Sequence, residues 1–373
     1  MKIIFTCGGT AGHINPAVAL ARMFQERVEG CQVLFVGAKG GMEERLVPKE
    51  GFPLETVTIS SFWRSLRPSG IQHNLRTLRN LSVSKREAAR ILDTFQPDLV
   101  VGTGGYASYP VVHAAARRGI PTAVHESNMV PGLTTELLEP YADRIMVGFE
   151  ACRAHYHHPD KVVVTGTPVR GDFFKMTRQE AKAALGVDDG RPLIVSFWGS
   201  LGAAGMNRAM ADFLALEAAK EPFHHIHGAG KSGYGQVLAA LKEKGVDLAD
   251  HPALQVREYI YDMATVMRAA DLVLCRAGAS TISELTALGV AAVIVPSPYV
   301  TNNHQEKNAR VLEKAGGAAV VLEKDADGQA LFQTSCAILH DADARSRMEK
   351  AMAGLGLPDA TERIYQTILQ ICR

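Results

Sequence analysis

Short apolar strands that run directly into glycine turns are the feature that most constrains this chain of 373 residues. The first turn, Gly8–Gly12, follows an apolar run that begins at Ile3, and comparable turns follow apolar runs at 102–105 and 199–205. A glycine turn between a strand and a helix presents backbone N–H groups at the helix N-terminus, where anions and polar ligands bind. Glycine is needed because a Cβ atom would keep the main chain away from the ligand. Three such turns predict a binding cleft lined by strand ends.

The alternation of apolar runs with helical patterns predicts the fold class. Runs such as Leu99–Gly102 and Leu193–Phe197 alternate along the chain with helical segments such as Pro16–Arg27 and His304–Lys314. Short, continuously apolar strands with intervening helices indicate buried parallel sheets joined by right-handed crossovers. The chain is also too long for one ordinary core. The sequence therefore predicts an α/β protein with two Rossmann-like domains.

The pattern restarts near residue 165, and this restart predicts the domain boundaries. We expect a first domain over residues 1–165 and a second over residues 166–357, with a hinge near 165–175. Residues 358–373 read as a capped amphipathic helix that begins at Asp359 or Ala360. We expect this C-terminal helix to pack back on the first domain.

Composition argues against several classes of protein. The net charge of +1 gives no global field for nucleic acid, so no nucleic-acid partner is expected. Six cysteines without pairing spacing fit a reducing cytoplasm. No apolar run is long enough for a signal peptide or a membrane span, which predicts a protein that is soluble or peripheral to a membrane. The histidine runs at 155–158 and 224–227 lack metal-ligand spacing, and we expect no metal.

The first glycine turn differs from a dinucleotide-binding fingerprint. When G-x-G-x-x-G is aligned on Gly8, its second and third glycines fall on Thr10 and His13, which argues against an NAD-dependent dehydrogenase. His13 lies where a strand turns into a helix. Its imidazole either bonds the local backbone or has a catalytic or substrate-orienting role.

Two segments of the second half carry candidate ligand contacts. Ser280 and Thr281 follow the strand that ends at Cys275 and are predicted to cap a helix. Glu284 either closes a capping box or accepts hydrogen bonds from the ribose hydroxyls of a nucleotide. The segment 303–305, Asn-His-Gln, begins another helix, which is either plainly capped or reads sugar hydroxyls.

A stretch over residues 62–81 combines apolar and basic side chains. Its apolar and basic members are Trp63, Ile71, Leu75 and Leu78, and Arg64, Arg67, Arg76 and Arg79. Basic residues beside an apolar face dock on anionic lipid headgroups, whereas an ordinary amphipathic helix has the same pattern with solvated arginines.

Together these motifs resemble the MurG family of peptidoglycan glycosyltransferases, over essentially the full length of the chain. The resemblance rests on the segments Gly8–His13, Gly104–Ser108, His125–Asn128, Gly199–Ala203, Cys275–Glu284 and Pro358–Arg363. The chain departs from the usual family pattern at Ala11, Trp198, Ala277 and His304. We expect Ala11 to shift the first turn and Trp198 to narrow a diphosphate site.

The resemblance implies a GT-B fold, in which two Rossmann-like domains with parallel sheets face a central cleft. It implies an acceptor site in the first domain and a UDP-GlcNAc site in the second. The implied reaction moves GlcNAc from UDP-GlcNAc to the C4 hydroxyl of MurNAc in lipid I, with inversion and without a metal or other cofactor. Implied partners are these two substrates, other cell-wall synthesis proteins, and the anionic cytoplasmic face of the plasma membrane.

The resemblance also implies roles for individual residues. His13 is the candidate general base, or it orients the acceptor. Residues implied to bind the donor are Thr10, Ala11, Gly12, Asn128, Arg170, Ser200, Ile260, Ala279, Ser280, Thr281, Ile282, Ser283, Glu284 and Gln305. Residues implied to contact either donor or acceptor are Gly104, Gly105, Tyr106, Glu126 and His304.

Two further classes remain open from the residues. One is a UDP-sugar enzyme that acts on diacylglycerol or a small acceptor, against which the segments 104–108 and 125–128 argue. The other is a nucleotide-sugar binding protein that has lost catalysis, which only Ala11 and Trp198 suggest.

Overall fold

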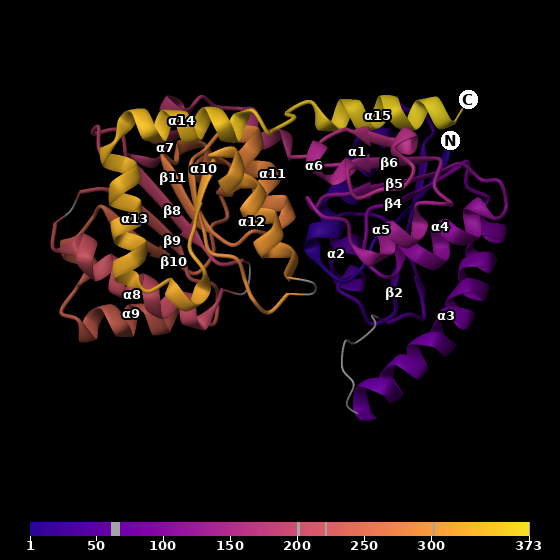
Figure 1. The fold of residues 1–373 in the computed structure, drawn as a ribbon, viewed down its shortest axis with the longest axis horizontal. Coiled ribbons are helices and arrows are strands. Elements are labelled where there is room, and N and C mark those ends of the chain that lie inside the picture. Colours follow the sequence, from indigo (N-terminus) through magenta and orange to yellow (C-terminus); the bar gives the residue numbers. More distant parts are fainter. Residues whose placement is uncertain (61–67, 200–201, 221, 301–302, 373) are drawn as a thin grey trace. The chain divides into compact units, whose positions relative to one another are not determined.

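The protein was analysed as a computed structural model that describes residues 1–60, 68–199, 202–220, 222–300 and 303–372 (Figure 1). The chain forms two compact units. The first comprises Met1–Val169 with Leu357–Arg373, and the second comprises Arg170–Gly356.

The first unit is built on a parallel sheet of seven strands in the order β3-β2-β1-β4-β5-β6-β7. The strands are β1 Lys2–Thr6, β2 Gln32–Ala38, β3 Leu54–Val57, β4 Leu99–Gly102, β5 Thr122–Glu126, β6 Arg144–Val147 and β7 Val162–Val164. The helices are α1 Ala11–Arg27, α2 Glu43–Lys49, α3 Pro68–Phe95, α4 Ser108–Ala116, α5 Leu133–Leu138, α6 Glu150–Arg153 and α15 Ala360–Ile371, with a 3₁₀ turn η1 at Pro159–Lys161.

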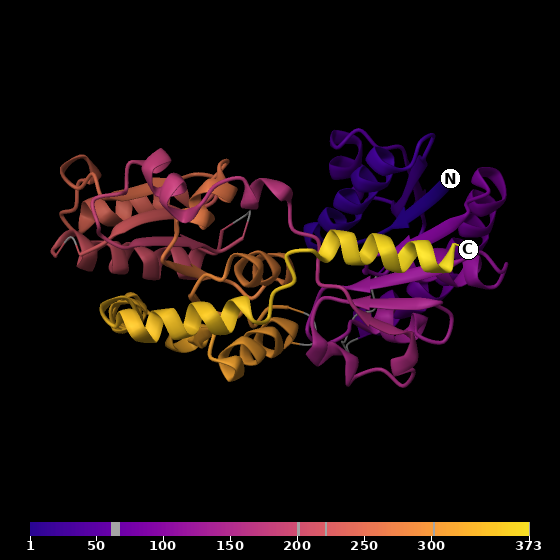
Figure 2. The same ribbon diagram turned by 90° about the horizontal axis from the view of Figure 1, so that it is seen from above.

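Alternation along β1 assigns the helices of this unit to the two faces of its sheet. Ile3 and Phe5 belong to the core formed with α1, α2 and α15, whereas Ile4 belongs to the core formed with α3, α4 and α5. Ile364 and Ile368 of α15 are fully buried in the first of these cores. Figure 2 shows α15, the helix that ends at the label C, lying over the strands of this unit.

The second unit repeats this organisation with six parallel strands in the order β10-β9-β8-β11-β12-β13. The strands are β8 Leu193–Phe197, β9 His224–Gly228, β10 Leu254–Arg257, β11 Leu272–Cys275, β12 Ala292–Ile294 and β13 Ala318–Val320. The helices are α7 Arg178–Leu185, α8 Ala204–Ala218, α9 Tyr234–Glu243, α10 Met263–Ala269, α11 Ala279–Leu288, α12 His304–Ala315, α13 Gly328–His340 and α14 Ala342–Ala353. Among the described residues of this unit, 3₁₀ turns occur at η2 Gly171–Phe174, η3 Leu248–Asp250 and η5 Glu323–Asp325.

Both sheets have the strand order of a doubly wound nucleotide-binding fold, in which the first strand of the unit lies centrally and the order reverses beside it. The predicted α/β class with parallel sheets is therefore confirmed. Ligands bind such sheets at the carboxyl ends of the strands near the reversal, which are the β1/β4 and β8/β11 pairs here. The glycine turns of the sequence follow three of these four strands, β1, β4 and β8.

Some predicted element boundaries need correction. Helix α1 begins at Ala11 rather than at Pro16, because the glycine turn leads directly into helix and Pro16 lies inside it. The predicted amphipathic stretch over 62–81 lies partly outside the described residues, and α3 is described there mainly by its backbone. Among the residues that the structure describes, no helix is long and apolar enough to cross a membrane.

Candidate active site

Two glycine turns of the first unit touch each other at the carboxyl ends of β1 and β4. The Gly8 N–H donates to the Gly104 carbonyl at 3.2 Å. A Cβ atom at Gly105 would lie 2.0 Å from the Gly8 carbonyl oxygen, and φ at Gly105 is +80°. Both the close approach and the positive φ require glycine at this position. The structure therefore brings Gly104 and Gly105 against the first turn.

His13 lies in the first turn of α1 and is half-buried. Its Nδ1 lies 2.8 Å from the Gly8 carbonyl oxygen, which can only accept a hydrogen bond, so Nδ1 carries the proton. In the neutral ring, Nε2 is then the acceptor. A Cβ atom at Gly104 would lie 3.1 Å from Nε2 and 2.8 Å from Cδ2, so the second glycine turn leaves room for this ring. The structure therefore places Nε2, the acceptor nitrogen of the neutral ring, beside the two turns.

Two other predicted residues surround this imidazole. The exposed Thr10 precedes α1, and its hydroxyl lies 3.4 Å from Nδ1 of His13. The Tyr106 ring lies against Gly9, where a Cβ atom would be 3.2 Å from the ring. Burial raises the pKa of Tyr106, and the Glu43 carboxylate raises it further, so its hydroxyl stays protonated near neutral pH. Gly12 is half-buried on the same helical turn.

The next strand, β5, ends in a carboxylate that orders the loop after it. Glu126 is 4% exposed and accepts from the backbone N–H groups of Asn128 at 3.0 Å and Gly132 at 2.9 Å. It also accepts from the Asn128 side-chain amide and the Thr135 hydroxyl, both at 2.8 Å. Glu126 thereby fixes the orientation of Asn128. The adjacent His125 is fully buried, and its Nε2 lies 2.9 Å from the Gly166 carbonyl oxygen.

In the second unit, helix α11 follows β11 and carries most of the predicted donor contacts. The helix begins at Ala279 with Gly278 as its N-cap, and no side chain caps it. The expectation that Ser280 or Thr281 caps α11 is therefore wrong. Ile282 is 1% exposed and lies in the core, and the Ser283 hydroxyl donates to the Ala279 carbonyl at 2.9 Å. These two residues can meet a ligand only through their backbone.

Glu284 lies in the second turn of α11, so it does not form a capping box. None of the described residues hydrogen-bonds its half-buried carboxylate. Burial raises its pKa from 4.5 to about 7, an effect that the Arg170 guanidinium opposes and Asp172 reinforces. Arg170 itself is exposed, lies 3.6 Å from Asp172 and covers the Phe173 ring at 5.4 Å. A carboxylate without a described partner, in the helix that follows β11, is suited to accept hydroxyl groups of a ligand.

Two further loops of this unit hold predicted residues. Ile260 follows β10 and is 4% exposed, and its side chain packs against Gly228, so its backbone is the part left for a ligand. Gln305 lies at the start of α12 beside His304, and its Oε1 accepts from the Ser297 N–H at 2.9 Å. This hydrogen bond fixes the proline-containing loop that follows β12 to the start of α12. The predicted Ser200 lies outside the described residues, as does the side chain of Ala11.

The indole of Trp198 lies in the core instead of the third glycine turn. It is 3% exposed and packs with Ile194 and Met206, and the Arg276 guanidinium lies 5.8 Å from its ring centre. Residues 194, 196 and 198 point to the same face of the sheet by strand alternation. The expected narrowing of a diphosphate site is not supported by this placement.

The histidine run on β9 forms a buried hydrogen-bonded network. His225 lies 2.6 Å from the Glu217 carboxylate and 2.7 Å from the Ser196 hydroxyl, which in turn lies 2.8 Å from His227. Burial lowers the pKa of His227 to about 3, so its ring is neutral. The described part of the chain holds no group of three or more His, Cys, Asp or Glu side chains placed for a metal. The network links β8, β9 and α8.

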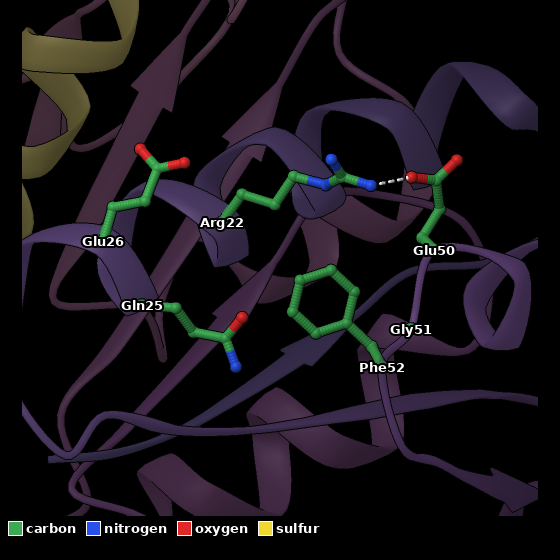
Figure 3. Close-up of a pocket in the computed structure, with 6 residues that line it drawn as sticks. All are labelled: Arg22, Gln25, Glu26, Glu50, Gly51 and Phe52. Atoms are coloured by element: carbon green, nitrogen blue, oxygen red, sulfur yellow. Dashed lines mark hydrogen bonds and ion pairs between the residues drawn. The ribbon is translucent and has the colours of Figure 1, made fainter.

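A surface pocket of about 380 Å³ lies in the first unit, away from the glycine turns (Figure 3). It is lined by Arg22, Gln25, Glu26, Glu50, Gly51 and Phe52. Arg22 forms an ion pair with Glu50, as the dashed line in Figure 3 marks. These α1 residues lie about two and a half turns or more beyond His13, so this pocket contains none of the predicted site residues.

Glu43 is a buried residue of this site that sequence reasoning missed. It is fully buried at the start of α2, and its carboxylate accepts from the Gly9 N–H at 2.5 Å. The only sequence signal was the cluster of Gly37, Gly40 and Gly41 just before it. Such a cluster indicates a close approach of the backbone to another group, without saying to which one.

Comparison with known proteins defines the class to which this fold and site belong. Residues 3–147 match the model of the glycosyltransferase family 28 N-terminal domain, and residues 193–364 match that of the glycosyltransferase family 28 C-terminal domain. The first match lies within the first unit, and the second covers most of the second unit together with the start of α15. The protein is therefore a glycosyltransferase of the GT-B fold class.

Individual relatives narrow the class. The chain is 40% identical over 373 residues to a UDP-N-acetylglucosamine--N-acetylmuramyl-(pentapeptide) pyrophosphoryl-undecaprenol N-acetylglucosamine transferase of Acetivibrio thermocellus, covering 100% of this chain and 99% of that protein. It is 42% identical to the transferase of the same name from Thermoanaerobacter sp., covering 100% of both. The crystal structure of Acinetobacter baumannii MurG superposes with a TM-score of 0.78 at 28% identity, covering 99% of each chain. This chain belongs to the MurG family.

Proposed function

We propose that this protein transfers GlcNAc from UDP-GlcNAc to the C4 hydroxyl of MurNAc in undecaprenyl-diphospho-MurNAc-pentapeptide, converting lipid I to lipid II. The observation that carries the proposal is the full-length identity of about 40% to transferases whose names state this donor and acceptor. A shared fold alone would support only the general class of glycosyltransferase.

His13 is the proposed general base of the first unit. The acceptor hydroxyl oxygen attacks C1 of GlcNAc on the face opposite UDP, and its proton passes to Nε2 of His13. The bond between C1 and the UDP oxygen breaks at the same time, so the configuration at C1 inverts. The Nδ1 contact with the Gly8 carbonyl supports this role, because it leaves Nε2 as the acceptor nitrogen. Asn128, Gly104, Gly105 and Tyr106 are the proposed neighbours of the reacting sugars.

The second unit is the proposed donor-binding unit. Glu284 accepts the ribose hydroxyls, a role supported by its lack of a described partner. Backbone N–H groups at Ala279–Thr281 and the Arg170 guanidinium meet the diphosphate, because helix N-termini and cations stabilise developing negative charge. The Ile260 backbone reads the uracil, and Gln305 with His304 reads the GlcNAc hydroxyls. Thr10, Ala11 and Gly12 of the first unit are further proposed contacts of the donor.

Charge stabilisation by these groups makes a metal dispensable in the proposed mechanism. The apolar and basic stretch at 62–81 is the proposed contact with anionic lipid, which would hold the enzyme peripherally at the cytoplasmic membrane face where its lipid-linked acceptor lies.

The test is transfer of labelled GlcNAc from UDP-GlcNAc to a short-chain lipid I analogue in the presence of EDTA. The proposal predicts a labelled disaccharide product and release of UDP. Diacylglycerol is the control acceptor and should remain unlabelled. Bound UDP-GlcNAc without product, both with EDTA and with added magnesium, would show a different acceptor or a lost activity.

A further inference from the structure

The buried Glu43 carboxylate lies behind the first glycine turn. It belongs to α2, which follows β2, whereas the turn follows β1. Its Oε1 accepts from the Gly9 N–H at 2.5 Å, while Oε2 is buried without a described hydrogen-bond partner. A fully buried carboxylate is costly unless its interactions compensate. Packing alone would therefore favour an apolar side chain at this position, and the carboxylate calls for a further role.

The backbone around Glu43 leaves room for the carboxylate at several positions. A Cβ atom at Gly37 would lie 2.7 Å from Glu43 Cβ, and one at Gly41 would lie 1.9 Å from Glu43 Oε2. A Cβ atom at Gly8 would lie 3.5 Å from Oε1. Three glycines thus surround this one side chain. The space left by their missing Cβ atoms lets the Glu43 carboxylate reach the first glycine turn from the neighbouring helix α2.

The peptide group between Gly8 and Gly9 connects Glu43 to His13. Its N–H donates to Glu43 Oε1, and its carbonyl oxygen accepts from Nδ1 of His13 at 2.8 Å. One planar peptide therefore joins the carboxylate to the imidazole through two hydrogen bonds. Hydrogen bonds arranged in a chain polarise one another, so a negative charge on the N–H side strengthens acceptance on the carbonyl side.

We propose that Glu43 is a positioning residue that acts on His13 through the Gly8–Gly9 peptide. It fixes the orientation of that peptide, which two glycines would otherwise leave free to rotate, and so holds the imidazole with its proton on Nδ1 and its acceptor nitrogen on Nε2. In catalytic triads a carboxylate bonded directly to the histidine does the same. The consequence for turnover rests on the proposed role of His13 as base, whereas the consequence for the tautomer does not.

Glu44 supplies the matched control. It is the next residue of α2, and its Oε1 accepts from the Gly40 N–H at 2.9 Å. It is exposed, and no hydrogen bond among the described residues joins it to the Gly8–Gly9 peptide. Glu44→Gln therefore removes one negative charge and alters one carboxylate–amide bond on the same helix, without touching the chain of bonds to His13.

The first measurement is the ¹⁵N NMR spectrum of the His13 imidazole in the full chain without substrate, assigned with His13→Ala. We expect the wild type and Glu44→Gln to carry the neutral-ring proton on Nδ1. Glu43→Gln should shift population toward the Nε2–H tautomer. In the transfer assay Glu43→Gln should lower kcat about 10-fold, by analogy with the hydrogen-bond partners of metal-bound histidines, with KM for UDP-GlcNAc unchanged.

The proposal is overturned if the wild-type ring carries its proton on Nε2, or if Glu43→Gln leaves both the tautomer and kcat as in Glu44→Gln. The wild-type spectrum decides the first point even if Glu43→Gln fails to fold. A second variant, Gly41→Ala, keeps the charge but displaces the carboxylate, and it should shift the tautomer in the same direction. If the wild type makes no lipid II, the proposed function fails, while the spectra still test Glu43.

Discussion

At the scale of single residues, the chemistry of the first unit depends on which nitrogen of His13 carries a proton. The Gly8 carbonyl fixes this from five residues away along the chain. Replacing His13 with alanine should lower kcat by about 100-fold or more, the usual cost of losing a general base. Steady-state transfer kinetics measure the effect. His155→Ala is the control, because that histidine is exposed and has no proposed role; equal activity of both variants would remove His13 from the mechanism.

Glu284 makes the second unit sensitive to pH. Its folded-state pKa of about 7 lies above the ordinary 4.5, so between these values the folded protein keeps a proton that the unfolded chain releases. The free energy of unfolding therefore falls as pH rises through this window. Glu284→Gln cannot ionise, so its free energy of unfolding should not fall in this window. The variant should therefore be more stable than the wild type above pH 7, which melting curves recorded across pH would show.

The same carboxyl group should control donor affinity in the opposite direction. Only the ionised form offers both oxygens as acceptors to two ribose hydroxyls. In the wild type, KM for UDP-GlcNAc should rise as pH falls below about 7. In Glu284→Gln, KM should be high and nearly independent of pH. A pH-dependent KM that persists in the variant would assign the titration to another group.

At the scale of elements, the contact between the two glycine turns determines the shape of the first site. Gly105→Ala combines a positive φ with a Cβ atom 2.0 Å from the Gly8 oxygen. Gly119→Ala is the control, because φ there is +71° and no atom lies near the new Cβ. The control should cost about 1–2 kcal/mol of unfolding free energy. Gly105→Ala should cost about 1–3 kcal/mol more of unfolding free energy by overpacking, and it should abolish GlcNAc transfer. Equal unfolding free energies of the two variants would mean that the two turns are not in close contact.

The sequence predicts elements better than the contacts between them. Leu99–Gly102 is four apolar residues between two helical patterns, and such a run has few alternatives to a buried parallel strand. Asp327 and Asp341 are typical N-cap residues, and each accepts from a backbone N–H group at the start of its helix, α13 or α14. The contact of Glu43 with Gly9 joins two βα units, and no periodicity encodes which buried acid reaches which turn. Trp198 was expected to narrow a diphosphate site because it stands beside the third glycine turn, whereas strand alternation with Ile194 explains why its indole lies in the core.

At the scale of the whole molecule, the last helix belongs with the first unit although it follows the second in sequence. Ile364 and Ile368 of α15 are fully buried beside Phe24 of α1. Removal of residues 357–373 should therefore destabilise the first unit, since each lost isoleucine costs about 2–5 kcal/mol. UDP binding should survive, because the proposed nucleotide contacts lie at 170–356. Calorimetry with UDP titration measures both, and loss of UDP binding with an intact first unit would contradict this division.

The proposed reaction is an inverting transfer to one hydroxyl of the acceptor. The most direct measurement is NMR of the disaccharide made from ¹³C-labelled UDP-GlcNAc and a lipid I analogue, which reports both linkage position and anomeric configuration. A GlcNAc joined through a β-linkage to C4 of MurNAc is the predicted product. An α-linkage, a different hydroxyl, or free GlcNAc in place of the disaccharide would contradict the account.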